Sequence, residues 1–140
     1  MFLIASALAL TVPVLTMAAE RIELIEHADT DATLDLGAKG DSVGDLLTWS
    51  NPLFDATNKT QIGSDQGYCV RVLAGKSWEC SWTNMLKEGQ IMVTGAFWDD
   101  KDSLLTVVGG TGKYVGAKGT LKLHARDAKA SSYQFIFDLL

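Results

Sequence analysis

Positive charge is scarce in this sequence. It has 12 Lys and Arg against 17 Asp and Glu, which gives a formal net charge of −5, and the basic residues are scattered singly. A surface that follows nucleic-acid phosphates needs clustered Lys and Arg. The composition therefore excludes nucleic acid as a partner.

A recognisable catalytic or metal-binding site is also missing. No catalytic triad can be assembled from the serines, the two histidines and the acids, so we do not predict a hydrolase. Two cysteines and two distant histidines, His27 and His124, do not have the spacing of a zinc site. The glycines of 109–112 lack P-loop spacing, so we interpret them as a sharp chain reversal. We expect neither a metal nor a cofactor.

The N-terminal segment carries no charge from Phe2 to Ala19 and contains Pro13. It is close to the roughly 18 residues that span a bilayer, so an uncleaved anchor is one interpretation. The small residues at its end favour the other, a cleaved secretory signal over 1–19. The mature chain, 20–140, is then one domain that is secreted or periplasmic, without stable membrane association.

Helical periodicity is absent after residue 20, and turn signals recur about every ten residues. This rhythm predicts an all-β domain of seven or eight short strands, as either a barrel or a sandwich. We expect a long loop or an irregular edge over 28–44, and an edge or bulge at Pro52. The predicted strands cover 21–27, 46–54, 67–73, 77–82, 90–97, 104–108, 120–125 and 133–139.

The two cysteines flank one short connection. A two-residue turn at Ala74-Gly75 would place Cys69 directly opposite Cys80, at a separation that suits a disulfide. A longer loop would shift this pairing. An oxidising compartment favours the bridge, so we predict a disulfide between Cys69 and Cys80.

Alternation along this hairpin places Cys69, Arg71, Trp78 and Trp82 on one face. If that face points inward, a charged Arg71 lies beside two indoles and needs a partner. If it points outward, the tryptophans lie at a rim or a subunit contact. Alternation alone leaves both arrangements open.

Five segments follow one another along the chain: Gly40-Asp41, 50–54, 62–69, 89–97 and 102–119. Taken in this order, they resemble the allene oxide cyclase/dirigent superfamily. The resemblance implies an eight-stranded antiparallel β-barrel with an interior apolar cavity, commonly a homotrimer. Such cyclases steer ring closure of a reactive epoxide, and dirigent proteins direct stereochemistry; both confine one conformer of a bound molecule.

The resemblance also implies roles for individual residues. Asn51 matches a cyclase asparagine that holds an ordered water, and Glu23 matches a glutamate that stabilises developing positive charge. Cys69 matches a cysteine of the cavity, although a disulfide would remove its thiol. Trp49, Trp78 and Phe97 match aromatic residues of the cavity. Arg71 and Trp82 lie on the same face of the hairpin as Trp78, so we add them as candidate ligand contacts.

These features predict a barrel that binds a small apolar molecule and acts as an isomerase or cyclase. One alternative is a non-catalytic scaffold or carrier that uses the same cavity. Another is a filled barrel whose function depends only on its outer surface. Chemistry requires Glu23 and Asn51 to face the lumen within reach of one bound atom. Either use of the lumen requires a cavity of at least ~300 Å³.

Overall fold

The computed structural model describes residues 19–140, so the predicted signal segment lies almost entirely outside the described residues. The chain is built from β-strands, joined by turns and one short 3-10 helix, η1 (Gly112–Tyr114). No helix in this part of the chain is long and apolar enough to cross a membrane. The strands are β1 (Glu20–His27), β2 (Ala32–Leu34), β3 (Leu46–Asp55), β4 (Gln61–Leu73), β5 (Ser77–Leu86), β6 (Gly89–Trp98), β7 (Ser103–Gly110), β8 (Gly119–Ala125) and β9 (Ser132–Leu139).

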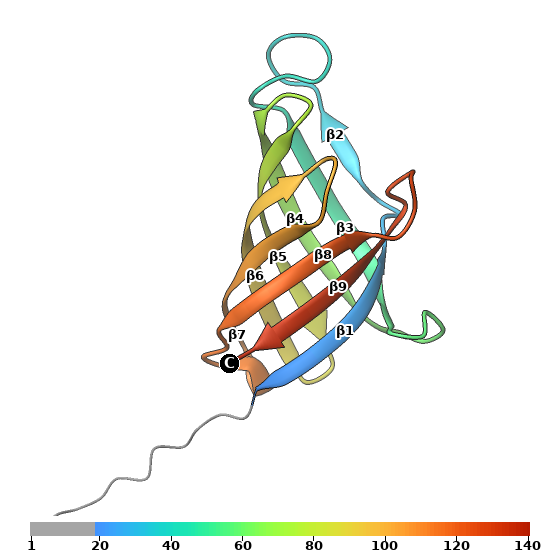
Figure 1. Ribbon diagram of the computed structural model, residues 1–140, viewed down its shortest axis with the longest axis vertical. Coiled ribbons are helices and arrows are strands. Elements are labelled where there is room, and N and C mark those ends of the chain that lie inside the picture. Colours follow the sequence, from blue (N-terminus) through green and yellow to red (C-terminus); the bar gives the residue numbers. More distant parts are fainter. Residues whose placement is uncertain (1–18) are drawn as a thin grey trace, which may run out of the picture.

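Eight of these strands close into an antiparallel barrel (Figure 1). Each of β3 to β8 pairs with the next strand in sequence, β9 pairs with β1, and β1 returns to β3 through residues 24–26. The short strand β2 adds to β3 beyond this closure. The fold class implied by the resemblance is thus confirmed, and the sandwich alternative is wrong.

The wall of the barrel has a local edge in β3. Between the part that pairs with β2 and the part that pairs with β1, residues 49–52 have β4 as their one strand neighbour. Pro52 lies in this stretch, next to an irregularity at Leu53 and Phe54. A proline cannot donate a ladder hydrogen bond, so it is tolerated at such an edge, as predicted.

Alternate residues of the eight barrel strands point inward and form one continuous core. The most enclosed are Leu24, Leu53, Ile91, Leu121, Phe135 and Phe137. Gly67 makes room for an indole, because a Cβ on it would lie 2.3 Å from Trp82 Cβ. Gly112 has φ of 59° and lies against the Glu88 carbonyl, which agrees with a sharp reversal over 109–112.

Candidate functional site

The lumen contains a narrow apolar pocket. Its free volume is about 60 Å³, well below the ~300 Å³ expected for a ligand site, so the roomy cavity predicted from the sequence is wrong for this conformation. A second hollow of about 300 Å³, called the vestibule below, lies beside it between the β6–β7 and β8–β9 connections. Phe97, Leu123 and Tyr133 line both the lumenal pocket and the vestibule.

Aromatic rings form most of the pocket wall. Trp49 and Trp82 meet edge to face with centroids 5.8 Å apart, and Trp82 lies 5.9 Å from Phe135. Phe97 and Tyr133 make a second edge contact at 6.0 Å, at the boundary with the vestibule. The predicted positions Trp49, Trp82 and Phe97 therefore do line the lumen.

Asn51 is a buried hydrogen-bonding centre on the local edge of β3. Its Nδ2 donates to Glu26 Oε1 (2.8 Å) and to Asp31 Oδ1 (2.7 Å). Its Oδ1 accepts from the Thr30 backbone N (2.9 Å) and lies 3.0 Å from the Thr30 hydroxyl. Because both amide hydrogens and both acceptor positions are occupied, Asn51 has nothing left for the water or substrate oxygen that the resemblance implied. It positions two carboxyl groups instead.

The inward carboxyl group of β1 belongs to Glu26 and not to Glu23. Glu23 lies on the outer face, where its side chain is 37% exposed and pairs with Arg21. The predicted lumenal position of Glu23 is therefore wrong. Glu26, three residues further on, is 5% exposed and lines the pocket. Burial, with a further contribution from Asp65, raises the pKa of Glu26 well above its usual range.

A third carboxyl group, Asp65, lies on β4 directly opposite Asn51 and is fully buried. Its Oδ2 accepts a hydrogen bond from Trp49 Nε1 (3.1 Å), which fixes the orientation of that indole. Burial raises the pKa of Asp65 to about 7. Burial, and then the proximity of Glu26, also raises the pKa of Tyr133. The lumen therefore disfavours negative charge on each of these groups.

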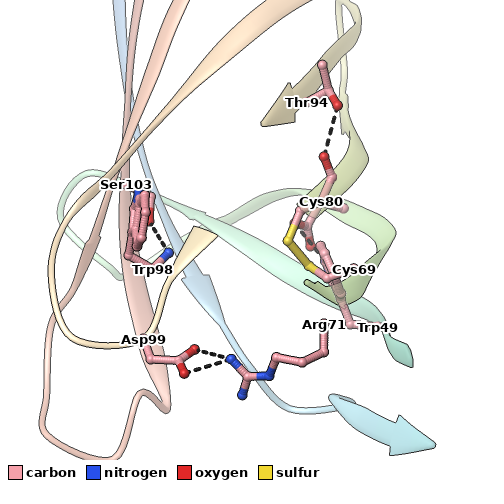
Figure 2. Close-up of a disulfide and its surroundings, with 9 residues drawn as sticks. Trp49, Cys69, Arg71, Cys80, Thr94, Trp98, Asp99 and Ser103 are labelled. Carbon is pink, nitrogen blue, oxygen red and sulfur yellow. Dashed lines mark hydrogen bonds and ion pairs between the residues drawn. A yellow bond between two sulfur atoms is a disulfide. The ribbon is translucent and has the colours of Figure 1, made fainter. Parts of the chain in front are cut away.

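The predicted disulfide between Cys69 and Cys80 is confirmed (Figure 2). The two residues are direct partners in the β4–β5 ladder, and both line the lumenal pocket. The turn bond from Lys76 N to Leu73 O is present, and an irregularity between Arg71 and Leu73 accommodates the connection. Cys69 contributes a bridged sulfur to the wall and no thiol.

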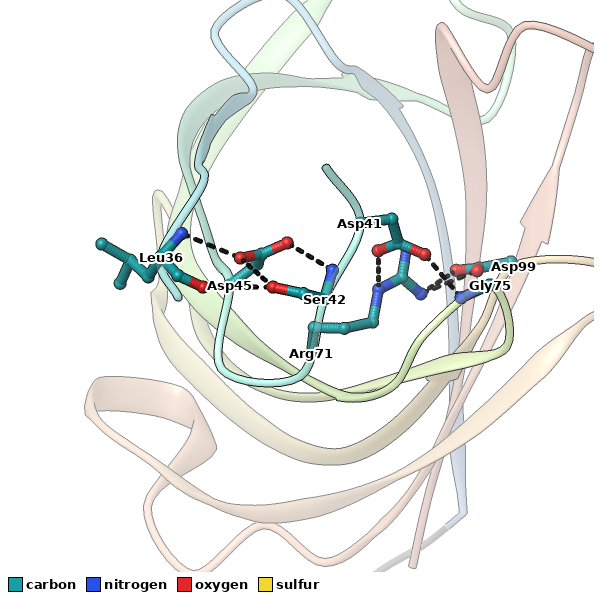
Figure 3. Close-up of polar contacts among 7 residues, drawn as sticks. All are labelled: Leu36, Asp41, Ser42, Asp45, Arg71, Gly75 and Asp99. Carbon is teal, nitrogen blue, oxygen red and sulfur yellow. Dashed lines mark hydrogen bonds and ion pairs between the residues drawn. The ribbon is translucent and has the colours of Figure 1, made fainter. Parts of the chain in front are cut away.

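Arg71 points inward at the mouth of the barrel and is 8% exposed, so the inward arrangement is the correct one. Its guanidinium lies 3.9 Å from the ring centre of Trp78. Arg71 NH1 binds Asp99 at 2.9 and 2.7 Å, and Nε lies 2.6 Å from Asp41 Oδ1, at an angle outside hydrogen-bond geometry. Figure 3 shows Arg71, with Asp41 and Asp99 around its guanidinium, lying across the ring of strands. Trp78 supports Arg71 at the mouth and is not part of the lumenal lining.

The loop that carries Asp41 is held in place by Asp45. Asp45 Oδ1 accepts from Leu36 N and Asp45 Oδ2 accepts from Ser42 N, both at 2.8 Å, as drawn in Figure 3. These hydrogen bonds lower the pKa of Asp45, and the bond from the Ser42 backbone has the largest effect. Asp41 also accepts a bond from Gly75 N at 2.5 Å. The loop is thus tied to the β4–β5 turn over the barrel mouth.

Three site residues, Glu26, Asp31 and Asp65, are absent from the sequence predictions. A signal for Glu26 exists in the alternation of 21–27, because Ile22 and Leu24 occupy the inward face and place Glu26 on it. Asp31 is carried by a loop, and Asp65 lies in a stretch that we interpreted as preceding a strand. Local patterns do not bring these two to Asn51: the β3–β4 ladder brings Asp65 there, and the pairing of β1 with β3 brings the loop that carries Asp31.

Comparison with known proteins agrees with this architecture. The family model described as allene oxide cyclase matches residues 17–129. Pyocyanin demethylase is similar in structure, with a TM-score of 0.76 and 26% identity over 86% of this chain and 100% of that chain.

More distant structures share the fold. A Diels-Alderase from Streptomyces koyangensis has a TM-score of 0.72 and 18% identity, over 87% of this chain and 63% of its own. A pterocarpan synthase dirigent protein has a TM-score of 0.69 and 12% identity, over 86% of this chain and 92% of its own. With the closed barrel and the matched residues together, the chain belongs to the allene oxide cyclase family.

Proposed function

We propose that this protein binds a small apolar molecule in the lumen and steers an isomerisation or a cyclisation of it. The observation that carries the proposal is the pairing of an aromatic wall with one polar end, where Asn51 holds Glu26 and Asp31. Glu23 faces outward and the hydrogen bonds of Asn51 are occupied, so the proposed chemistry does not use the pair that the sequence predicted. The rings would confine one conformer, and a protonated Glu26, in place of Glu23, would donate a hydrogen bond to an oxygen or nitrogen of the bound molecule. Pyocyanin, named for the demethylase relative, is one test compound.

A guest larger than a few atoms requires the pocket and the vestibule to join. Rotation of Phe97 or Tyr133 would connect the 60 Å³ pocket with the 300 Å³ hollow, because both residues line each of them. Edge contacts between rings are worth only about 1 kcal/mol, so such a rotation is accessible. The guest would then lie between Trp49 inside and the β6–β7 connection outside.

A non-catalytic scaffold or carrier is the second candidate. It is favoured by the saturated hydrogen bonds of Asn51, which leave Glu26 and Asp31 as the polar groups available to a guest at that end of the pocket. Isomerisation and cyclisation conserve mass, whereas a carrier releases its guest unchanged. The two candidates therefore differ in the product.

Native mass spectrometry of the protein purified after expression tests the proposal by detecting a co-purified molecule. The extracted molecule is then incubated with ligand-free protein and followed by chromatography at constant mass. A new isomer supports chemistry, and an unchanged guest supports the carrier. As an independent measurement, pyocyanin is titrated while the indole N–H signals of Trp49 and Trp82 are followed by NMR. If no molecule co-purifies and these signals do not shift, lumenal binding is contradicted.

A further inference from the structure

The lumenal pocket carries carboxyl groups and no positive charge. Glu26 and Asp31 line it, and no Lys, Arg or His of residues 19–140 does. The inward Arg71 is occupied by Asp41 and Asp99 at the mouth. The vestibule is more mixed in charge. Asp99 pairs there with Arg71 and Asp102 pairs with Lys122 and His124, which leaves Asp100 and Asp127 beside Lys101. Clefts lined by one sign of charge concentrate ligands of the opposite sign.

One oxygen at the polar end of the pocket has no partner. Asn51 Nδ2 binds Glu26 Oε1 and Asp31 Oδ1 together, so two carboxyl groups share a single nitrogen. Two carboxylates at such close range repel each other unless a proton or a cation lies between them. The hydrogen bonds found among residues 19–140 leave Glu26 Oε2 free, on a side chain that is 5% exposed and lines the pocket. This oxygen calls for a donor or a positive charge.

The aromatic wall suits a positive charge as well. The faces of indole and phenyl rings attract cations, most strongly where water is excluded. The protein already uses this contact twice outside the pocket: the Arg71 guanidinium lies 3.9 Å from the Trp78 ring centre, and Lys101 Nζ lies 4.2 Å from that of Trp98. Arg71 also shows that this barrel holds a planar cation between an indole and two carboxylates.

We propose that the lumen selects a planar aromatic cation, such as an N-alkylated nitrogen heterocycle, over neutral or anionic aromatics of the same shape. This rests on the function proposed above, since it names the class of guest. The cation would lie against Trp49 and Trp82 with its charge toward Glu26 Oε2. An anionic guest would place its charge against Glu26 and Asp31, which is unfavourable at low dielectric.

Cation binding should be linked to proton release. The titratable groups around Glu26 are Asp29, Asp31, Asp65 and Tyr133, none of which supplies a positive charge. Burial raises the pKa of Glu26, so part of the population holds a proton there that an incoming cation displaces. The affinity for a cation therefore rises with pH over the range in which Glu26 loses its proton. The affinity for a neutral guest does not rise in this way.

Three probes of nearly equal shape test this: N-methylquinolinium, 1-methylnaphthalene and 1-naphthoate. Each is titrated into the intact protein by calorimetry in two buffers of different ionisation enthalpy, which reports proton release. We expect the cation to bind at least about tenfold more tightly than the neutral probe, with protons released. Glu26→Gln should remove this preference and keep the neutral affinity. Glu23→Gln, on the outer face of the same strand, is the matched control and should change neither.

The outcomes separate the two proposals. Equal or tighter binding of the neutral or anionic probe overturns cation selectivity and leaves lumenal binding intact. Absence of binding by all three probes up to about 1 mM overturns both. If Glu26→Gln fails to fold, the proton release and the pH profile of the wild-type protein still decide the question. A cation that binds without proton release, with an affinity that does not change with pH and is the same in Glu26→Gln as in the wild type, contradicts the role of Glu26.

Discussion

At the scale of single residues, this barrel keeps ionisable groups where water does not reach. Asp65 is fully buried, and its Oδ1 has no hydrogen-bond partner in the described chain. Its neighbour across β4–β5, Asn84, likewise has a buried Oδ1 without a partner. A buried acid with a raised pKa destabilises the fold once it ionises. The lumen therefore retains a destabilising group that a purely structural core would not need.

Replacement of Asp65 with Asn should stabilise the protein above neutral pH. The pKa of Asp65 is about 7 in the folded protein and ordinarily 3.8. Its ionisation therefore does not lower the free energy of unfolding below pH 4, lowers it progressively as pH rises from 4 to 7, and lowers it by a constant amount at higher pH. The loss is at most about 4 kcal/mol. Asn keeps an acceptor for Trp49 and can donate to Asn84.

The free energy of unfolding is measured in urea at pH 5 and at pH 8. It should decrease less between these two pH values for Asp65→Asn than for the wild type. Asp138→Asn, at an exposed position, is the control, and parallel pH slopes for all three proteins would contradict the prediction.

Residue identities at the site were only partly predictable from the sequence. Trp49 and Phe97, which the resemblance indicated, and Trp82, which hairpin alternation indicated, do line the lumen. Trp78, which both sources indicated, lies against Arg71 at the mouth instead. Glu23 is not in the lumen, because its register came from a short matched segment, whereas Ile22 and Leu24 already assign the inward face of that strand to the even-numbered residues. Where the two sources disagree, the hydrophobic alternation reports the physical constraint.

At the scale of elements, the strand pattern was predictable and strand lengths were not. β4 begins at Gln61, several residues before the run that the sequence predicts. Its first part contains Gly63, Ser64 and Asp65, which have low intrinsic strand preference. Pairing with β3 and β5 on either side recruits this stretch into the sheet. Tertiary context thus overrides local propensity in the segment that contributes a carboxyl group to the interior.

The disulfide of the β4–β5 hairpin should contribute measurably to stability. Cys69 and Cys80 are 11 residues apart, and closing a loop of this size stabilises a fold by about 2–3 kcal/mol. We expect the double replacement Cys69→Ala with Cys80→Ala to lower the urea midpoint accordingly. A reducing agent should lower the midpoint of the wild type and leave that of the variant unchanged. An identical midpoint for oxidised and reduced wild type would show that the bridge does not stabilise the fold.

At the scale of the whole molecule, closure of the barrel was the step that sequence patterns could not decide. Alternating strands are compatible with a sandwich, and the contact that excludes it joins residues 24–26 to residues 53–55. That pairing brings the inward face of β1 against the local edge of β3, which is where Asn51 meets Glu26. Barrel closure and assembly of the polar site are therefore the same event.

The outside of the barrel is strongly uneven in charge. In the β8–β9–β1 part of the wall, the outward residues include Arg21, Glu23, Lys122 and Asp138. In the β3–β7 part, as far as the structure describes it, Glu79 is the one charged residue among the outward strand positions. Its exposed apolar side chains are Ile62, Tyr68, Val70, Val72, Met92, Leu104 and Val108. A large uncharged, partly apolar surface is typical of a contact between subunits.

We expect this wall to associate with further copies of the chain, in the homotrimer that the family resemblance implies. Tyr68 lies in the middle of it and is 52% exposed, with Thr48 and Ser81 as its ladder neighbours. A lysine there would place three charges in the contacts of a symmetric trimer and leave the lumen untouched. Native mass spectrometry and light scattering at about 10 μM should show a trimer for the wild type and mainly monomer for Tyr68→Lys. Lys122→Glu, on the charged part of the wall, should remain trimeric. A monomeric wild type would contradict the trimer, and a trimer that survives Tyr68→Lys would place the contact elsewhere.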